Sequence, residues 1–324
     1  MAAKPLDGFQ SFGRPCRPIV LSGPTAVGKS EVAIRLAEFL NGEIICVDSM
    51  QVYRGMDIGT AKPSASERAS VPHHLLDVAE LTESFDAAQF TRLAHRVVSE
   101  IQARNRVPIL CGGTGLYFKA YLYGLGETPP GDPVLRFALE ATPLQELLRE
   151  LAGRDPVAYE KIDRQNPRRV IRAVEVIRLT GKPFSAQRAR WQSVGADSYQ
   201  ALGIGLERSS GDLRRRIDIR VEQMFRAGLV AETEALLARG LARNQTASQA
   251  LGYRQVAEHL RGQRSLPETI KLVKIRTWQF AKRQMTWFRR QMALKWFKIE
   301  ADETVANVVE RVVTELQAAA AVRQ

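Results

Sequence analysis

Hydrophobic positions predict alternating strands and helices in the first third of the chain. Short apolar runs at residues 18–21, 44–47 and 107–111 are typical of buried strands. Between them, apolar residues recur at helical spacing over residues 32–40 and 90–101. Strands that alternate with helices form parallel sheets, so this order predicts an α/β fold in which helices flank a parallel sheet.

The pattern changes after Tyr123. Gly and Pro are frequent from 124 to 133, and only helical periodicity follows as far as about Trp191. Residues 201–206 then predict a strand that returns to the sheet. We therefore expect an all-helical insertion within the sheet domain. The predicted parts are an N-terminal extension at 1–17, a core at 18–123 and 199–300, a helical insertion domain at 124–198, and a C-terminal helix and tail at 301–324.

Composition narrows the class of protein. Of the 324 residues, 45% are hydrophobic and 25% are charged, which excludes a wholly disordered chain. No apolar run approaches the ~18 residues of a membrane span, and residues 1–18 lack a secretory signal, so we expect a cytoplasmic protein with no membrane partner. Cys16, Cys46 and Cys111 have no CxxC spacing, which argues against a disulfide framework or a zinc site.

The charge balance predicts a polyanionic partner. Lys and Arg number 47 against 35 Asp and Glu, a net charge of +12, and nucleic acid is favoured over an acidic membrane surface. A helix is expected near 266–292, and helical spacing over the basic segment 271–298 places Trp296 on a core-facing side and Arg276, Arg283 and Arg290 along another flank. These arginines either contact RNA or diphosphate, which we favour, or form a solvated face. A second cluster leaves both interpretations open: Arg168, Arg169 and Arg172. In a third cluster, an arginine that points into the crevice would reinforce Lys29: Arg214, Arg215, Arg216 and Arg220.

Residues 23–30 (GPTAVGKS) form a phosphate-binding motif. They match GxxxxGK[ST] and lie between a predicted strand and a predicted helix. Glycines allow backbone N–H groups to surround phosphate oxygens, Lys29 adds a positive charge, and Ser30 can ligate Mg²⁺. The motif therefore predicts a bound polyphosphate without identifying it.

Two further segments follow predicted strands and are expected at the same edge of the sheet. Asp48 can ligate a metal, accept a proton or cap a helix. In residues 112–117, the glycines permit either close approach of a ligand or a tight turn. His73 and His74 lack the other ligands of a metal site, so we favour packed or hydrogen-bonded side chains.

Several long motifs accompany the phosphate loop. They are DSMQVYRGMDIGTAKP at 48–63, PHHLLD at 72–77, GGTGLYF at 112–118, NPRRVIRAVEV at 166–176, QALGYRQ at 249–255 and AKRQMTWFR at 281–289. In this order, they closely resemble the motifs of the tRNA dimethylallyltransferase family, also called tRNA isopentenyltransferases.

The resemblance implies a reaction and its partners. A dimethylallyl group would pass from dimethylallyl diphosphate to the exocyclic N6 of the adenine at position 37 of tRNA. The resemblance also implies a P-loop NTPase-like core, a helical insertion that grips the anticodon stem-loop, and a requirement for Mg²⁺. The phosphate loop would hold diphosphate rather than ATP, and we expect a monomer.

The resemblance further implies the site residues. Asp48 would accept the proton from adenine N6, Thr114 would lie near the reacting centre, and Arg220 would contact the diphosphate. The implied diphosphate-binding residues are Gly23, Thr25, Ala26, Val27, Gly28, Lys29 and Ser30, and Ser30 is also the implied metal ligand. The residues expected to contact tRNA or its adenine are Ser49, Gln51, Arg168, Arg172, Gln249, Arg276, Arg283 and Arg290.

Two other functions fit the residues when the resemblance is set aside. A small-molecule or nucleoside kinase would use the same phosphate loop and an Asp after the second strand. A non-catalytic RNA-binding ATPase module would leave Asp48 dispensable. The residues alone rank the kinase level with the transferase, because they specify only a polyphosphate and a polyanion. The motif resemblance favours the transferase.

Overall fold

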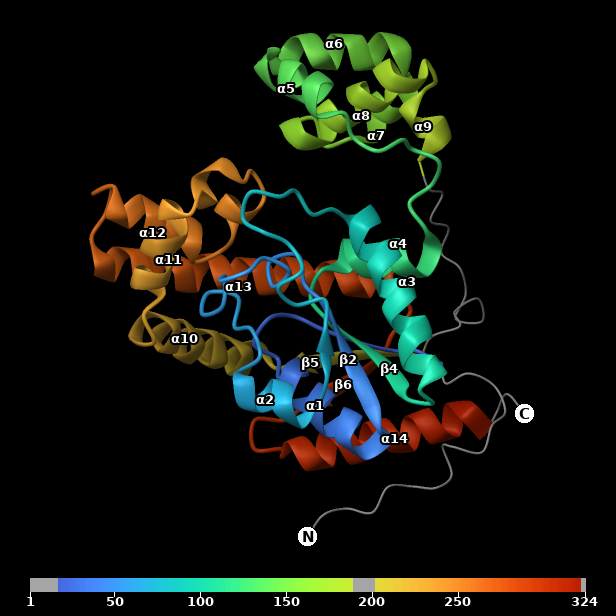
Figure 1. Ribbon diagram of the computed structural model, residues 1–324, viewed down its shortest axis with the longest axis vertical. Helices are drawn as coiled ribbons and strands as arrows, with labels where there is room; N and C mark the ends of the chain where they lie inside the picture. Colours follow the sequence, from blue (N-terminus) through green and yellow to red (C-terminus); the bar gives the residue numbers. More distant parts are fainter. Residues whose placement is uncertain (1–16, 189–201, 322–324) are drawn as a thin grey trace. The chain divides into compact units, whose positions relative to one another are not determined.

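The structure is a computed structural model that describes residues 17–188 and 202–321. It divides the chain into two compact units, a core that is interrupted by an insertion (Figure 1). The insertion takes residues 123–193 in this division, compared with the expected 124–198. Residues 1–16, and so nearly all of the expected extension and Cys16, lie outside the described residues, as do 189–201 and 322–324.

The core is built on a six-stranded sheet in which every pair of neighbours is parallel. The strands are β1 (Ile19–Ser22), β2 (Gly42–Val47), β3 (His73–His74), β4 (Val107–Gly112), β5 (Leu202–Arg208) and β6 (Lys295–Ile299). Their order across the sheet is β3-β2-β4-β1-β5-β6. The predicted α/β fold with a parallel sheet is therefore confirmed, and β1 lies at its centre between β4 and β5.

The helix predicted near 266–292 is confirmed, but the placement of Trp296 on a helical stripe is wrong. The helix α13 covers Leu266–Gln291, and the edge strand β6 follows it. Met292 already has the extended conformation, and Phe297 and Ile299 are buried on alternate positions of the strand. Trp296 therefore packs from the sheet, where its ring covers Gly205 of β5, and does not belong to a helical stripe. Pairing with β5 outweighs the helical spacing of the aromatic residues.

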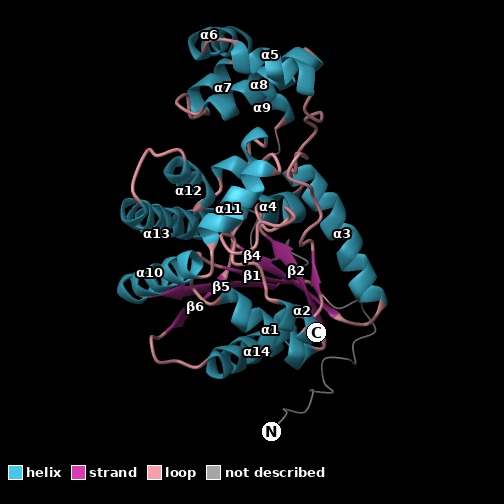
Figure 2. Ribbon diagram, turned by 60° about the vertical axis from the view of Figure 1, so that its left-hand side comes forward, coloured by secondary structure: helices cyan, strands magenta, loops and turns pink. Residues whose placement is uncertain are grey.

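Helices cover both faces of the sheet (Figure 2). On one face lie α1 (Lys29–Leu40) and α14 (Val305–Ala321), and on the other lie α3 (Ala87–Ala103), α4 (Gly115–Tyr123) and α13. The remaining helices of the core are α2 (Ala65–Ser70), α10 (Ser210–Arg226), α11 (Leu229–Ala238) and α12 (Tyr253–Leu260). None of the helices in the described ranges combines the length and apolar character that a bilayer crossing demands.

The insertion is a small helical unit with its own core, as predicted. Its helices are α5 (Pro133–Ala141), α6 (Leu144–Arg154), α7 (Pro156–Lys161), α8 (Pro167–Thr180) and α9 (Phe184–Gln187). Leu139, Leu151 and Val170 are fully buried where the helices meet. The buried carboxylate of Glu175 accepts hydrogen bonds from Arg136 and Arg172, so a charged group is compensated inside the unit.

A buried acidic residue at the start of β2 stabilises the edge of the core sheet. The side chain of Glu43 is 3% exposed and accepts hydrogen bonds from Arg104 and from His74 of β3. His73 is hydrogen-bonded to the carbonyl of Val71. These contacts show that both histidines serve as hydrogen-bonding groups. Burial works to raise the pKa of Glu43, but the bonds from Arg104 and His74 outweigh it and hold the pKa below 4.5.

Glu43→Gln is expected to lower the free energy of unfolding at pH 7 by about 1–3 kcal/mol, because the charged network loses its centre. The lowered pKa of Glu43 means that the wild-type advantage is present above pH 4.5 and is lost as the pH falls through the folded-state pKa. Urea melts of both proteins at a series of pH values measure this. A difference that stays constant into the acid range would contradict it.

Candidate active site

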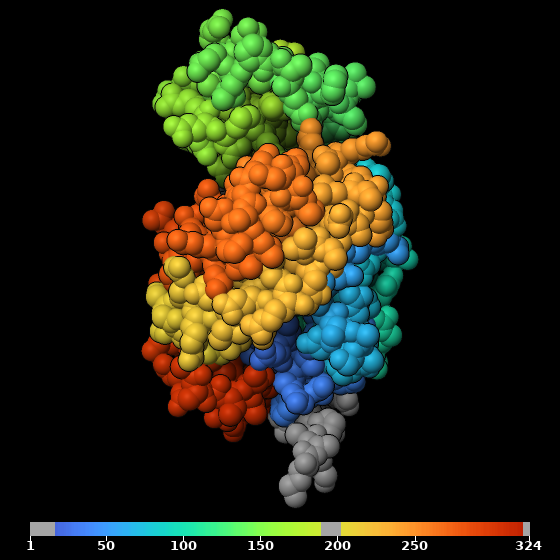
Figure 3. All heavy atoms as spheres, turned by 90° about the vertical axis from the view of Figure 1, so that its left-hand side faces the viewer, coloured from blue at the N-terminus to red at the C-terminus, as the bar shows by residue number. Residues whose placement is uncertain are grey.

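The carboxyl ends of three central strands meet around one cavity of the core. The phosphate loop follows β1, Asp48 follows β2, and Gly113 follows β4, and all three segments line a cavity of about 570 Å³. Parallel strands that end at one edge bring such segments together from distant parts of the sequence. On the far side of the cavity, α10 lies beside the segment that carries α2 (Figure 3).

The phosphate loop has a backbone conformation that is suited to anions. Ala26 and Gly28 have positive φ angles of 64° and 108°, and the loop leads into the N-terminus of α1. Two arginines bind its carbonyl oxygens: Arg208 donates to Val27 O at 2.9 Å, and Arg216 donates to Ala26 O at 2.9 Å. Carbonyl oxygens that faced a phosphate would repel it. The two arginines bind these oxygens, so that the N–H groups of the loop can face the ligand.

Lys29 completes the phosphate loop. Its ammonium donates to Gly23 O at 2.9 Å and to Pro24 O at 2.8 Å. The pKa of Lys29 is lowered to about 8, chiefly by burial; the charge of Arg220 acts in the same direction, and that of Asp48 opposes it. The two carbonyl contacts are weak substitutes for an anion, so a bound diphosphate would stabilise the charged form of the lysine.

Asp48 lines the cavity, and the protein binds one of its two carboxylate oxygens. Its Oδ1 accepts from the N–H groups of Met50 at 2.8 Å and of Gln51 at 3.3 Å. No described residue donates to Oδ2. Burial raises the pKa of Asp48, against the effect of those bonds and of the charge of Lys29, which makes the carboxylate a stronger proton acceptor. A turn follows Asp48, so the helix-cap interpretation is wrong.

The glycine-rich turn after β4 is shaped by helix α13. A Cβ atom at Gly113 would lie 2.4 Å from Gln284 Nε2, and one at Gly115 would lie 2.2 Å from the ring of Trp287. Side chains of α13 therefore occupy the space beside these two glycines. The adjoining Thr114 does not line the cavity, because its Oγ1 accepts the N–H of Ser49 at 3.0 Å and joins the ends of β4 and β2.

Gln284 is a site residue that the sequence analysis missed. Its buried side chain accepts the N–H of Thr25 at 2.8 Å and donates to Gly113 O at 2.9 Å. One amide from α13 thus joins the phosphate loop to the turn after β4. The only sequence signal is its place within the AKRQMTWFR motif, where the basic and aromatic neighbours draw attention away from it.

The arginines of α10 divide between the cavity and the protein surface. Arg216 and Arg220 line the cavity, and burial lowers the pKa of Arg220, with the charge of Asp48 acting in the opposite direction. Arg214 instead pairs with Asp218, and Arg215 with Asp212. Two of the four clustered arginines therefore add positive charge beside Lys29.

Comparison with known proteins gives the family. The family profile described as "IPP transferase" matches residues 51–291. A protein of Citrifermentans bemidjiense named tRNA dimethylallyltransferase 1 is 43% identical over 290 residues, which cover 90% of this chain and 94% of that protein. This chain belongs to the tRNA dimethylallyltransferase family.

Solved structures of dimethylallyltransferases share the fold. The full-length tRNA isopentenylpyrophosphate transferase from Bacillus halodurans has a TM-score of 0.69 at 39% identity, and the match covers 95% of this chain and 99% of that chain. A eukaryotic dimethylallyltransferase acting on tRNA has a TM-score of 0.73 at 27% identity, covering 88% of this chain and 74% of that chain. The fold predicted from the motifs of this family is therefore confirmed.

The residues that the dimethylallyltransferase resemblance linked to tRNA are dispersed. Gln51 lines the cavity, whereas Arg283 and Arg290 border a separate depression on the exposed side of α13. Arg276 and Gln249 lie on the core outside the cavity, where Arg276 donates to Gln279 and Gln249 is exposed in a 3₁₀ turn. Arg172 lies within the insertion and pairs with Glu175. Arg168 is exposed near the start of α8, and Ser49 contacts Thr114.

The affinity for inorganic diphosphate is expected to fall as the pH rises through about 8, because the Lys29 ammonium then loses its proton in the free protein. Lys29→Arg keeps the charge, since a guanidinium stays protonated throughout this range. Calorimetric titrations of both proteins with diphosphate measure the effect. An equal decline in Lys29→Arg would show that diphosphate or another group titrates instead.

Proposed function

We propose that this protein transfers a dimethylallyl group from dimethylallyl diphosphate to the exocyclic N6 of adenosine 37 in tRNA. The observation that carries the proposal is the single cavity that is lined both by a cationic phosphate loop and by Asp48, whose Oδ2 no described residue binds. The family relationship identifies the substrates. One half of the cavity supplies positive charge for the diphosphate, and the other supplies a proton acceptor for the adenine amine.

The cationic half stabilises the leaving group. As the allylic C–O bond lengthens, negative charge builds on the diphosphate. Lys29 and Arg220 line the cavity where that charge would develop, and the phosphate loop leads into the N-terminus of α1, which adds positive potential. The Thr25 N–H and the Lys29 ammonium would exchange their present protein partners for the diphosphate. We assign diphosphate contacts to residues 23–30 on this basis. Gly23 and Val27 act through the backbone, since neither residue lines the cavity.

Asp48 accepts the proton of the nucleophile. The lone pair of adenine N6 is delocalised into the ring, so the amine needs an acceptor that orients it and removes a proton as the N–C bond forms. In the balanced step, the N6–C bond forms, the C–O bond breaks, and the N6 proton passes to Oδ2 of Asp48. Thr114 acts on this centre through Ser49, because it does not reach the cavity.

Mg²⁺ fits the site through one protein ligand. The Ser30 hydroxyl lies at the start of α1 on the cavity wall, and no group of three or more acidic, His or Cys ligands occurs in the described ranges. Mg²⁺ commonly keeps several waters and binds through substrate phosphates. Ser30 would therefore hold the ion together with the diphosphate oxygens, and the ion would supply countercharge for the leaving group.

The basic face of α13 supplies a contact surface for RNA. Arg283 and Arg290 are exposed on it beside Trp287, and both can bind backbone phosphates. A base within a stacked loop cannot reach a cavity of this kind, so adenosine 37 must turn out of the stack. We also propose that the insertion binds the anticodon arm, and that the enzyme acts as a monomer in the cytoplasm.

A transfer assay tests the proposed function. The purified protein is incubated with unmodified tRNA, Mg²⁺ and labelled dimethylallyl diphosphate, and a parallel reaction contains labelled ATP in its place. Label is expected in tRNA in the first reaction alone. Phosphate transfer from ATP without RNA would instead support a kinase.

Asp48→Asn is expected to reduce transfer about 100-fold or more while tRNA binding stays unchanged, because the amide keeps the turn but cannot take a proton. Single-turnover rates and filter binding measure the two effects. If Asp48→Asn lost RNA affinity by as large a factor as it lost transfer rate, this role would be contradicted.

Arg283→Ala is expected to weaken tRNA binding and to flatten its dependence on salt by about one phosphate contact. Lys298→Ala removes the same charge from an exposed position on β6 and serves as the control. Binding isotherms at several salt concentrations separate the two. Equal salt slopes for the two variants would show that only net charge matters.

A further inference from the structure

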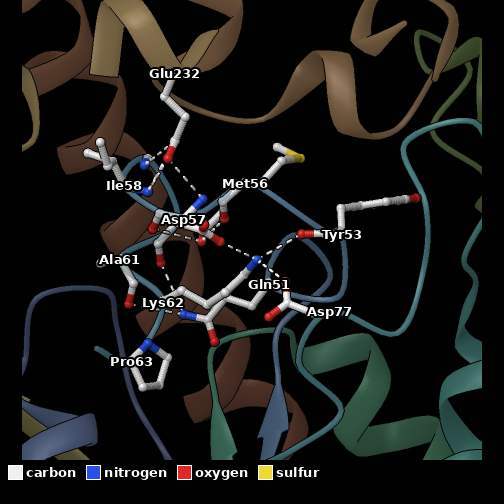
Figure 4. A network of polar contacts seen from close by, with 12 residues as sticks. Gln51, Tyr53, Met56, Asp57, Ile58, Ala61, Lys62, Pro63, Asp77 and Glu232 are labelled. Carbon is white, nitrogen blue, oxygen red and sulfur yellow. Dashed lines mark hydrogen bonds and ion pairs between the residues drawn. The ribbon is translucent and has the colours of Figure 1, made fainter. Parts of the chain in front are cut away.

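Lys62 lies beside the cavity with its charge fully engaged by the protein (Figure 4). Its side chain is 1% exposed. The ammonium donates to Tyr53 O at 2.8 Å, to Asp57 Oδ1 at 2.6 Å and to Asp77 Oδ1 at 2.6 Å. An ammonium has three N–H donors, so these contacts leave none for a ligand. Lys62 therefore acts on the protein and not on the substrates.

These contacts hold a loop that has an unfavourable backbone. Ala61 and Asp77 have positive φ angles of 48° and 55°, a conformation that residues other than glycine rarely adopt. The ammonium joins the two segments that contain them. On the outer side, the carboxylate of Glu232 accepts the N–H of Ile58 at 2.9 Å, so the loop is fixed from both sides (Figure 4).

The loop in turn orients the amide of Gln51. Gln51 Nε2 donates to Thr60 O at 3.0 Å and to Ala61 O at 3.3 Å, and Asp77 N–H donates to the main-chain oxygen of Gln51 at 3.2 Å. Both acceptors are carbonyls, so only the NH₂ group of the amide can face them. No described residue donates to Oε1, and Gln51 lines the cavity. The side chain thus offers the cavity an acceptor and no donor.

We propose that Lys62 is a positioning residue that fixes Gln51 as a hydrogen-bond acceptor, so that the site prefers a purine with an amine at C6 to one with an oxygen there. The inference rests on the proposed function. Adenine carries two N–H donors at C6, whereas hypoxanthine and guanine carry an acceptor oxygen. An oxygen facing Oε1 has no proton to share, and the buried pair would stay unsatisfied.

Loss of Lys62 is expected to relax this selection. Without the ammonium, Asp57 and Asp77 are no longer joined, and the carbonyls of Thr60 and Ala61 can move. The Gln51 amide can then turn over and present its NH₂ group to an oxygen. The expected signature is a change in the preference between two bases, which a general loss of stability would not produce.

The test compares anticodon stem-loop RNAs that carry adenosine or inosine at position 37. Affinities are measured for the full-length protein, for Lys62→Met and for Arg68→Met, which serves as the control. Arg68 also binds Asp77, at 2.9 Å, but is 36% exposed and contacts neither Tyr53 nor Asp57. Wild type and Arg68→Met are expected to bind the adenosine RNA about tenfold tighter. In Lys62→Met this ratio is expected to fall at least about threefold.

A folded Lys62→Met with the wild-type ratio would overturn the inference, as would a wild type without preference. If Lys62→Met does not fold, Asp57→Ala replaces it, because Asp57 is 55% exposed and provides one of the three contacts. The ratio must then fall in the same direction, and an unchanged ratio also overturns the inference. Transfer of label to the adenosine RNA by wild type is measured in parallel, so that failure of the proposed function is seen separately.

Discussion

The close approach of backbone segments at the ends of β1, β2 and β4 is the constraint on which the site depends. A Cβ atom at Gly112 would lie 2.0 Å from Val47 O, and one at Gly23, which follows β1, would lie 2.5 Å from Leu206 O of the neighbouring strand β5. Because Gly112 has no side chain, the N–H groups of Gly113 and Thr114 both reach Val47 O at 3.2 Å. This contact sets the turn after β4 beside Asp48, and without it the cavity would lose one wall.

Electrostatic preorganisation follows from this backbone arrangement. Lys29, Arg216 and Arg220 line the cavity, and four carbonyls of the phosphate loop are bound by arginines or by Lys29 itself. The burial that lowers the pKa of Lys29 also raises the pKa of Asp48. An anion beside Lys29 would stabilise the charged lysine, and a proton donor beside Asp48 would find a carboxylate that binds protons more tightly than usual. A diphosphate substrate supplies the anion, and an amine substrate supplies the proton.

The sequence predicted the parts of this arrangement that local patterns encode. The phosphate motif, the apolar strands and the position of Asp48 after β2 were sufficient to predict the sheet edge and its contents. The strand β6 was missed because the spacing of Trp296 also fits a helix, and only pairing with β5 decides it. Gln284 and Lys62 were not identified as linking residues because their partners lie on segments whose approach is set by tertiary packing. Such contacts leave no periodic signal in a single sequence.

The most direct test of the account is a crystal structure with an anticodon stem-loop and dimethylallyl thiodiphosphate, an analogue whose allylic bond resists cleavage. The diphosphate is expected on the N–H groups of the phosphate loop with Lys29 against it, in place of the carbonyls of Gly23 and Pro24. Adenine N6 is expected within hydrogen-bonding distance of Asp48 Oδ2. Diphosphate bound elsewhere, or an adenine that does not approach Asp48, would contradict the claim that one cavity joins the two reactants.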